Sequence, residues 1–380
     1  MARRQVAQEQ IATSTQGKQI ALLAPSMRVG GVEQVTANLA IGLDRAGHRV
    51  DLLLGQRKGK LLGRIPDTID VMGMADRVKG VSAVPFSPPR VAQYLRRTNS
   101  DAVIAGPTNC NISLLVAAAM AQYDGKTILT QHIHPGNPTR MDRIAFLTAR
   151  RLYPSADAVV CVSDSMAEEF ANILDLPRED VRTVYNPVVS HELQVQMQEP
   201  VEHEWFDSDV PVVASLGRLA DQKDFPTLLR SFATVLDDMN AHLFMMGSGE
   251  RRDDLESLAE RLDIAEKVEF TGFIDNPYKY LSHADLFVLS SIREGLPTVL
   301  IEALACGCPV VATDCPSGPR EILQDGAYGS LVPVCDDDAM ATAIRNQLQD
   351  PPSRDRQQRR SEKFSIKTAT DNYLEIVNEV

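Results

Sequence analysis

The sequence lacks any apolar run long enough to cross a membrane, and it contains few cysteines. One of its longest apolar stretches, Ile112 to Ala121, has 10 residues, whereas a membrane span needs roughly 18 to 20. The first 18 residues are polar and have no apolar segment of the kind found in a secretory signal, so we expect a disordered leader there. Six cysteines without a C-x-x-C pair indicate reduced, small apolar side chains in a cytoplasmic protein.

Positive charge is scarce in the second half of the chain. Residues 191–380 hold 17 lysines and arginines against 34 acidic residues, a net charge of −17, whereas residues 1–190 hold 22 against 17, a net charge of +5. A strongly acidic half argues against nucleic acid as the main partner. The basic half could face an anionic membrane surface or a phosphorylated acceptor, or both halves could simply be solvated.

Arginines recur at helical spacing in the basic half. The stretch "RMDRIAFLTARRLY" carries Arg140, Arg143, Arg150 and Arg151 beside aromatic and aliphatic residues. Such a helix can dock on an anionic lipid surface or guide a lipid-pyrophosphate acceptor, and an ordinary helix with solvated arginines is the alternative. We therefore expect a cytoplasmic protein that can associate peripherally with the inner face of the membrane.

Short apolar strands alternate with helical segments along most of the chain. The pattern starts at Gln19 and restarts at Val210, after the polar, acidic segment Val189 to Asp209, which is the best linker candidate. Strands alternating with helices form parallel sheets of right-handed βαβ units. The sequence predicts an α/β protein with two doubly wound Rossmann-like domains, over residues 19–190 and 191–365, facing a central cleft.

Glycines and histidines follow two predicted strands of the first half, where ligands bind in doubly wound sheets. Gly30 and Gly31 open a helix, so bare backbone N–H groups can approach an anion there, although a tight turn is the simpler alternative. The pair is not a G-x-G-x-x-G fingerprint, so a dinucleotide site is poorly supported. His132 and His134 follow another strand without a nearby third metal ligand, which favours one catalytic or binding histidine over a metal site.

Two cations follow the first strand of the second half. Arg218 and Lys223 come directly after "VVASLG", which ends in Gly217. An arginine offers a planar fork of donors and a lysine a point charge, a combination that suits a diphosphate. Solvent-facing side chains are the alternative.

Two carboxylates bracket an apolar helix in the stretch "SSIREGLPTVLIEALACGCPVVATD". Glu294 lies in the loop before the helix, which we predict to start near Pro297 and to stop at Gly307, and Glu302 lies about a turn and a half into it. The backbone amides at the helix start point toward an anion, and the two acids can bind hydroxyls on either side of its phosphates. This pattern indicates a nucleotide-sugar site.

These motifs together resemble the retaining glycosyltransferases of family four, which have the GT-B fold. The resemblance rests on "EGLPTVLIE", "GRLADQK", "FTGFIDN", "MRVGGVEQVTANLA" and "LTQHIH", and it covers nearly the whole chain from Gln19 onward. The motif "DCPSGPREIL" is further similar to members that build lipid-linked or surface glycans. The resemblance implies an N-terminal acceptor-side domain, a C-terminal donor domain, and a C-terminal helix over 366–380 that returns to the N-terminal domain.

The resemblance also implies roles for individual residues of the donor domain. Arg218 and Lys223 would hold the donor diphosphate, with Gly217 letting the backbone approach it. Glu302 would bind the ribose and Glu294 the hydroxyls of the donor sugar. The remaining donor-binding positions would act mostly through their backbone: Gly272, Phe273, Gly295, Leu296, Pro297, Thr298 and Val299.

In the acceptor-side domain, the resemblance places His132 near the transferred sugar. Many relatives have no second histidine at the position of His134, and His132 is favoured because it directly follows the apolar strand. Gly30, Gly31 and Glu33 would line the phosphate side of the cleft. We count His132, Glu294, Arg218 and Lys223 as the catalytic candidates.

The implied reaction moves a hexose or N-acetylhexosamine from a nucleotide-sugar, with UDP favoured, to a glycan or lipid-linked acceptor with an α-glycosidic bond. Arg218, Lys223 and the helix amides would stabilise the charge that grows on the leaving diphosphate, so we expect no metal and no cofactor. No enzymatic nucleophile is obvious, which implies front-face attack assisted by the leaving phosphate.

Three other functions stay open at this point. A nucleotide-sugar 2-epimerase on the same fold is disfavoured by the E-x7-E pattern with the GGVE loop. A dinucleotide-dependent oxidoreductase is disfavoured by the missing fingerprint. A catalytically silent sugar-binding protein is disfavoured because every donor-site position is intact.

Overall fold

The computed structural model describes residues 17–28, 30–75, 87–132 and 140–379. Most of the predicted leader and His134 lie outside these ranges. By contact density the described chain divides into two compact units. The first runs to Leu129 and includes Ser155–Ala158, and the second comprises Thr130–Pro154 and Val159–Asn378. The domain boundary predicted at residue 190 stays a prediction.

The first sheet has seven strands in the order β3-β2-β1-β4-β5-β6-β7. The strand pairs with a described register are parallel; for example, Leu22 lies between Leu52 and Ile104. Its central strands are buried apolar runs, as expected of a parallel sheet covered by helices. The strands are β1 (Gln19–Ala24), β2 (Arg49–Leu54), β3 (Asp70–Gly73), β4 (Ala102–Ala105), β5 (Lys126–Gln131), β6 (Ala158–Cys161) and β7 (Val181–Thr183).

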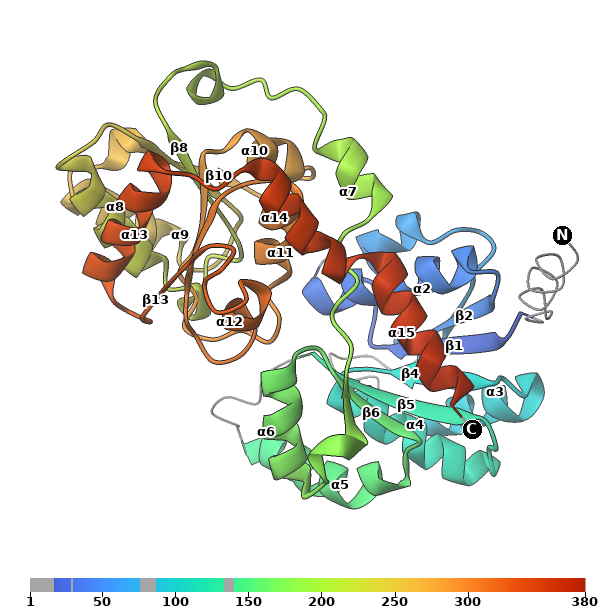
Figure 1. Cartoon of the computed structure of the whole chain (residues 1–380). Helices are drawn as coiled ribbons and strands as arrows, with labels where there is room; N and C mark the ends of the chain where they lie inside the picture. The colour runs from blue at the N-terminus through green and yellow to red at the C-terminus, as the bar shows by residue number, and fades with distance from the viewer. Residues whose placement is uncertain (1–16, 29, 76–86, 133–139, 380) are drawn as a thin grey trace, which may run out of the picture. The chain divides into compact units, whose positions relative to one another are not determined.

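The second sheet has six strands in the order β10-β9-β8-β11-β12-β13, again in parallel pairs. Helices α8 and α13 lie on one side of it, and α10 and α11 on the other (Figure 1). The order reverses between β8 and β11, the switch point beside which ligands bind in such sheets. The strands are β8 (Val212–Leu216), β9 (His242–Met246), β10 (Val268–Gly272), β11 (Leu286–Leu289), β12 (Val310–Thr313) and β13 (Ser330–Val332).

Helices follow most of the strands, which confirms the doubly wound α/β prediction. Those up to residue 196 are α2 (Gly31–Arg45), α3 (Pro88–Thr98), α4 (Thr108–Ala121), α5 (Arg140–Leu152), α6 (Asp164–Leu174) and α7 (His191–Gln196). The others are α8 (Phe225–Leu236), α9 (Arg252–Arg261), α10 (Tyr278–His283), α11 (Thr298–Ala305), α12 (Pro319–Ile322), α13 (Asp337–Gln349), α14 (Arg354–Ser361) and α15 (Ile366–Asn378). Within the described ranges, none of these helices is long and apolar enough to span a bilayer.

A closely packed apolar core lies against the second sheet. Phe232 of α8, Leu243 of β9, Val288 of β11 and Ile344 of α13 are at most 1% exposed and belong to one apolar cluster. All six cysteines are free, as predicted, and five of them are buried. The close packing fixes the carboxyl ends of β8 and β11, from which the predicted donor residues project.

The predicted linker, Val189 to Asp209, lies in the connection between β7 of the first sheet and β8 of the second, and it is folded. This segment contains α7 and a short 3-10 helix, and the backbone carbonyls of Gln196 and Met197 accept hydrogen bonds from Asn276, just before α10, and from Ser282 of α10. Trp205 stacks on His242 with ring centroids 4.1 Å apart, and His203 pairs with Glu269 at 2.7 Å. The polar composition suggested a solvated connector, but the alternate apolar and aromatic side chains find partners on β9 and β10 that sequence periodicity does not reveal.

Candidate functional site

The loops that follow β8 and β11 meet in an ion pair between two predicted site residues. Lys223 ends a short 3-10 helix (Asp221–Lys223), and its Nζ donates to Oε1 of Glu294 at 2.6 Å. Only 18% of the lysine side chain and 11% of the glutamate side chain are exposed. Gly217 makes room for this lysine, because a Cβ there would lie 3.2 Å from Lys223 Cε.

Glu294 is held on both its carboxylate and its backbone. The hydroxyl of Ser291 donates to Oε1 at 2.7 Å, and the hydroxyl of Ser317 donates to the backbone carbonyl at 2.7 Å. Both described side-chain donors therefore use Oε1, and no described residue donates to Oε2. A ligand hydroxyl can bind the second oxygen without displacing either partner.

Arg218 has a different environment from Lys223. Its side chain is exposed, and it forms no ion pair with a described carboxylate. The structure thus joins Lys223 to Glu294 and leaves the Arg218 guanidinium with its charge uncompensated by described residues. Such a group can turn toward an anion bound at the carboxyl end of β8.

The loop from Gly295 to Pro297 leads into α11, whose first helical residue is Thr298. The predicted start near Pro297 is confirmed, with the proline itself as the N-cap. Leu300 N–H donates to the Pro297 carbonyl at 3.1 Å, but the amides of Leu296, Thr298 and Val299 donate to no described residue. Free amides at a helix N-terminus, with the helix dipole behind them, form a binding site for negative charge.

Glu302 is a buried carboxylate on α11. It is 7% exposed, and its side chain accepts no hydrogen bond from a described residue. Burial raises the pKa of Glu302 to about 7, and the positive charge of Lys223 opposes that rise. A buried acid without donors is unfavourable in an isolated protein, and ligand hydroxyls would relieve it.

Gly272 and Phe273 lie where β10 ends. Gly272 has a φ of +75°, which glycine adopts without strain, and its carbonyl accepts the Gly247 N–H at 2.8 Å. The Phe273 side chain is 54% exposed, an unusual fraction for a large apolar ring. The Phe273 ring therefore lies at the surface beside a tight turn.

His132 is enclosed by two polar partners. Its Nε2 lies 2.9 Å from the Thr130 hydroxyl, and its Nδ1 lies 3.3 Å from Oδ1 of Asn186, a carbonyl oxygen that can only accept. Burial lowers the pKa of His132 to about 4, so the ring is neutral near pH 7. No described contact joins His132 to Lys223 or Glu294. Asn186 was missed in the sequence because it lies 54 residues away.

Gly30, Gly31 and Glu33 form the start of α2 in the first unit. Gly30 is the N-cap, and a Cβ there would lie 2.5 Å from Oε2 of Glu33, so the carboxylate folds back onto its own helix start. The space around Gly31 is open. The start of α2 therefore interacts with its own Glu33, and its predicted role toward a bound phosphate stays a prediction.

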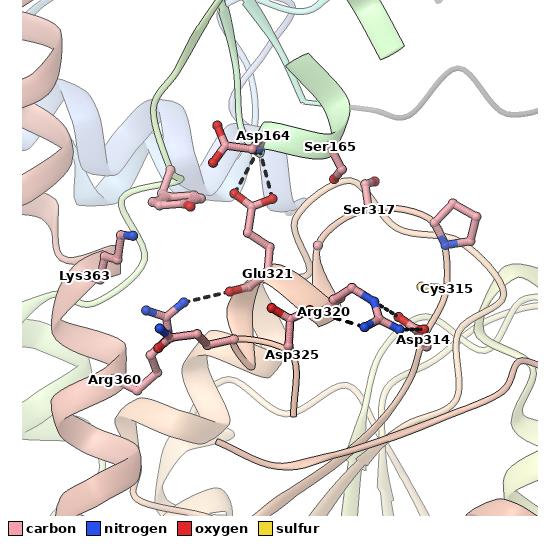
Figure 2. A pocket seen from close by; sticks show the side chains of 14 residues that line it. Asp164, Ser165, Asp314, Cys315, Ser317, Arg320, Glu321, Asp325, Arg360 and Lys363 are labelled. Carbon is pink, nitrogen blue, oxygen red and sulfur yellow. Dashed lines mark hydrogen bonds and ion pairs between the residues drawn. The ribbon is translucent and has the colours of Figure 1, made fainter. Parts of the chain in front are cut away.

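A cavity of about 580 Å³ lies in the second unit (Figure 2). It adjoins the Glu294 loop, because the lining residue Ser317 donates to the Glu294 carbonyl. It is lined by the start of α6, Tyr185, the loop after β12, α12, and residues near the end of α14. The sequence singled out "DCPSGPREIL" only as part of a resemblance, and the contribution of α6 and Tyr185 was missed. Among the described residues, no cluster of histidine, cysteine or acidic side chains could hold a metal ion.

Two family models match consecutive parts of the chain. Glycosyltransferase Family 4 matches residues 29–191, and Glycosyl transferases group 1 matches residues 198–364. The chain belongs to the family-four glycosyltransferases. This confirms the predicted family.

Curated relatives from bacteria are about a third identical to this chain over the aligned residues. The N-acetylgalactosamine-N,N'-diacetylbacillosaminyl-diphospho-undecaprenol 4-alpha-N-acetylgalactosaminyltransferase of Campylobacter jejuni is 32% identical over 52% of this chain and 53% of the relative. The lipopolysaccharide core biosynthesis glycosyltransferase LpsE of Rhizobium meliloti is 31% identical over 59% of this chain and 65% of the relative. The chain thus spans between half and two thirds of these relatives.

Solved structures agree with the fold over nearly the full length. HepE of Anabaena, in complex with UDP, has a TM-score of 0.76 at 20% identity and covers 95% of this chain and 100% of its own. The lipopolysaccharide outer core galactosyltransferase WaaB has a TM-score of 0.75 at 19% identity, and the match covers 94% of this chain and 99% of WaaB. These likenesses confirm the predicted GT-B fold.

Proposed function

We propose that this protein is a retaining glycosyltransferase that moves a hexose or N-acetylhexosamine from a nucleotide-sugar to a glycan or lipid-linked acceptor. The carrying observation is the buried, donor-free carboxylate of Glu302, which lies on the helix whose free N-terminal amides follow Glu294. A nucleotide-sugar supplies both the hydroxyl donors and the phosphate acceptors that this site lacks. Its hydroxyls would satisfy the carboxylates, and its phosphates would accept from the amides.

The electrostatics support diphosphate departure without a metal ion. The free amides before α11 and the uncompensated Arg218 would meet the negative charge that grows on the leaving group, and Lys223 would add its charge nearby. Lys223 would also hold the Glu294 carboxylate in place beside the sugar. The mechanism that we propose is front-face attack assisted by the leaving phosphate, with retention and an α-linkage.

His132 enters the proposal as a neutral hydrogen-bonding group. Because the pKa of His132 is lowered to about 4, the ring does not carry a positive charge at neutral pH. Asn186 fixes the proton on Nδ1, which leaves Nε2 as an acceptor for the Thr130 hydroxyl or for a sugar hydroxyl.

UDP is the nucleotide that we would test first. The sequence favours it, and HepE, which has the same fold, is solved with UDP. The Campylobacter relative is named for a diphospho-undecaprenol acceptor, and LpsE for the lipopolysaccharide core, so a lipid-linked or surface glycan is the proposed acceptor class.

A cytoplasmic location with peripheral membrane contact belongs to the same proposal. In the first unit, Val116 and Met120 on α4 are 37% and 45% exposed, and Arg96 of α3 donates to the Met120 carbonyl. Arg96 and Arg97 are themselves exposed. Apolar side chains beside arginines suit an anionic lipid surface.

The test is product formation from a panel of UDP-, GDP- and ADP-sugars with a lipid-linked glycan extract as acceptor. We expect transfer from one nucleotide class, and NMR of the new linkage should show the anomeric configuration of the donor. Free epimer in the absence of acceptor would instead indicate the epimerase, and an inverted linkage would contradict the retaining mechanism.

A further inference from the structure

Hydrogen bonds between helices hold the lining of the cavity beside the Glu294 loop in place. The Glu321 carboxylate on α12 accepts the Asp164 N–H with both oxygens, at 2.9 and 3.0 Å, and so caps the start of α6 (Figure 2). The Arg360 side chain donates to the backbone carbonyls of Glu321 and Ile322 at 2.7 Å each. Because these contacts join α6, α12 and α14, the cavity is preformed, and its volume of about 580 Å³ is within the usual range for ligand sites.

This cavity shares a wall with the predicted donor-sugar loop. Ser317 lines it and donates to the Glu294 carbonyl at 2.7 Å. Gly318, also in the lining, has a φ of +88°, and a Cβ there would lie 2.5 Å from Pro297 Cδ. An attacking hydroxyl must come within roughly 3 to 3.5 Å of the reacting carbon. A molecule in this cavity therefore lies next to the place where the donor sugar would react.

The charges of the lining argue for a neutral ligand. The cavity has three cations, Arg320, Arg360 and Lys363, and four carboxylates, Asp164, Asp314, Glu321 and Asp325. The formal sum is −1, so a phosphate or pyrophosphate would meet more negative than positive charge. Many donors and acceptors with little net charge are suited to a hydroxyl-rich sugar.

Arg320 is held in place by two carboxylates of this set. It lies between Asp314 and Asp325, and its Nε donates to Asp314 at 3.1 Å while its Nη1 donates to Asp325 at 3.3 Å (Figure 2). A further bond from Nη2 to Asp314 brings the total to three. A guanidinium has about five N–H donors, so about two remain for sugar hydroxyls or an acetamido carbonyl.

We propose that this cavity is the acceptor subsite and binds one or two neutral sugar residues of the acceptor glycan, with Arg320 as a specificity-determining residue. The inference rests on the proposed function for its reaction, but the binding itself does not require turnover. Any phosphate of a lipid-linked acceptor would lie outside this cavity.

Saturation-transfer NMR with methyl glycosides tests the proposal. The probes are the methyl α-glycosides of glucose, galactose and N-acetylgalactosamine, with inorganic pyrophosphate as the anionic alternative. The variants are Arg320→Gln, which removes the oriented donors, and Ser165→Trp, which fills the cavity. Arg359→Gln is the matched control, because Arg359 is an exposed arginine of α14 outside the lining. Calorimetry with UDP is run on each protein.

We expect at least one glycoside to bind the wild type and the Arg359→Gln control, and to lose most of its signal in Arg320→Gln and Ser165→Trp. The affinity for UDP should stay within about twofold in all four proteins. Absence of glycoside binding to the wild type, survival of the signal in Arg320→Gln, or binding of pyrophosphate in place of sugar would each overturn the proposal. If Ser165→Trp does not fold, Arg320→Gln decides. Failure of UDP to bind the wild type would instead contradict the proposed donor function. The glycoside result would still decide the acceptor subsite, because glycoside binding does not require UDP.

Discussion

The Lys223 ammonium donates to the Glu294 carboxylate at 2.6 Å across 71 residues of sequence. Both side chains are mostly buried, so each compensates the charge of the other. Removal of one partner from such a pair leaves an uncompensated charge and typically costs about 3 to 5 kcal/mol. The pair also brings the loops after β8 and β11 together at the sheet's switch point.

Lys223→Met should therefore impair both stability and transfer. We expect a lower free energy of unfolding, by about 3 kcal/mol, and a transfer rate reduced on the order of 10²-fold. Denaturant unfolding and initial rates of Lys223→Met, Glu294→Gln and the double variant measure the coupling between the pair. Lys267→Ala, which removes a half-buried lysine bonded to Asn240, is the control. Additive effects of the two single changes would show that the ion pair does not couple the loops.

Transfer should continue after metal removal, because cations and helix amides of the chain itself would stabilise the leaving diphosphate. We expect full turnover in EDTA. Activity that EDTA abolishes and magnesium or manganese restores would show that the diphosphate is neutralised by a metal instead.

Much of this arrangement follows from the sequence, and the exceptions share a cause. The helix around Glu302, the strand before Lys223 and the loop of Glu294 follow from apolar runs, a proline and a glycine, which are local signals. Ser317 and Asn186 could not be assigned, because each contacts its partner through tertiary packing over 23 and 54 residues. A single sequence does not specify such pairings.

The stability of the protein without ligand should decline with pH because of Glu302. The pKa of Glu302 is raised from its ordinary value of 4.5 to about 7, so between these values the folded state holds a proton that the unfolded state has lost. Folding stability should then fall as the pH rises through this window, by on the order of 3 kcal/mol in total.

Glu302→Gln should remove this dependence. The free energy of unfolding of the wild type and of the variant is compared at pH 4.5 and at pH 8. At pH 4.5 the two proteins should be similarly stable, and at pH 8 the variant should be more stable than the wild type. Parallel stability profiles would contradict a buried, donor-free carboxylate.

Membrane association should depend on charge at the end of α3. We expect wild-type protein to float with liposomes that contain anionic lipid at low salt, and Arg96→Gln/Arg97→Gln to float less. High salt should reduce the binding of the wild type, since exposed charges are screened. Arg359→Gln is the control. Equal recovery with neutral and anionic liposomes would remove the membrane from the proposed function.

The most direct test of the donor site is UDP calorimetry on wild type, Glu302→Gln and Glu294→Gln, paired with transfer rates. Glu302 is predicted to bind the ribose, which does not react, so its loss should weaken UDP binding by about 1.5 to 3 kcal/mol. Glu294 is predicted to contact the transferred sugar, so Glu294→Gln should bind UDP almost normally and slow transfer strongly. UDP binding that is unchanged in Glu302→Gln, or equal defects in both variants, would contradict the account.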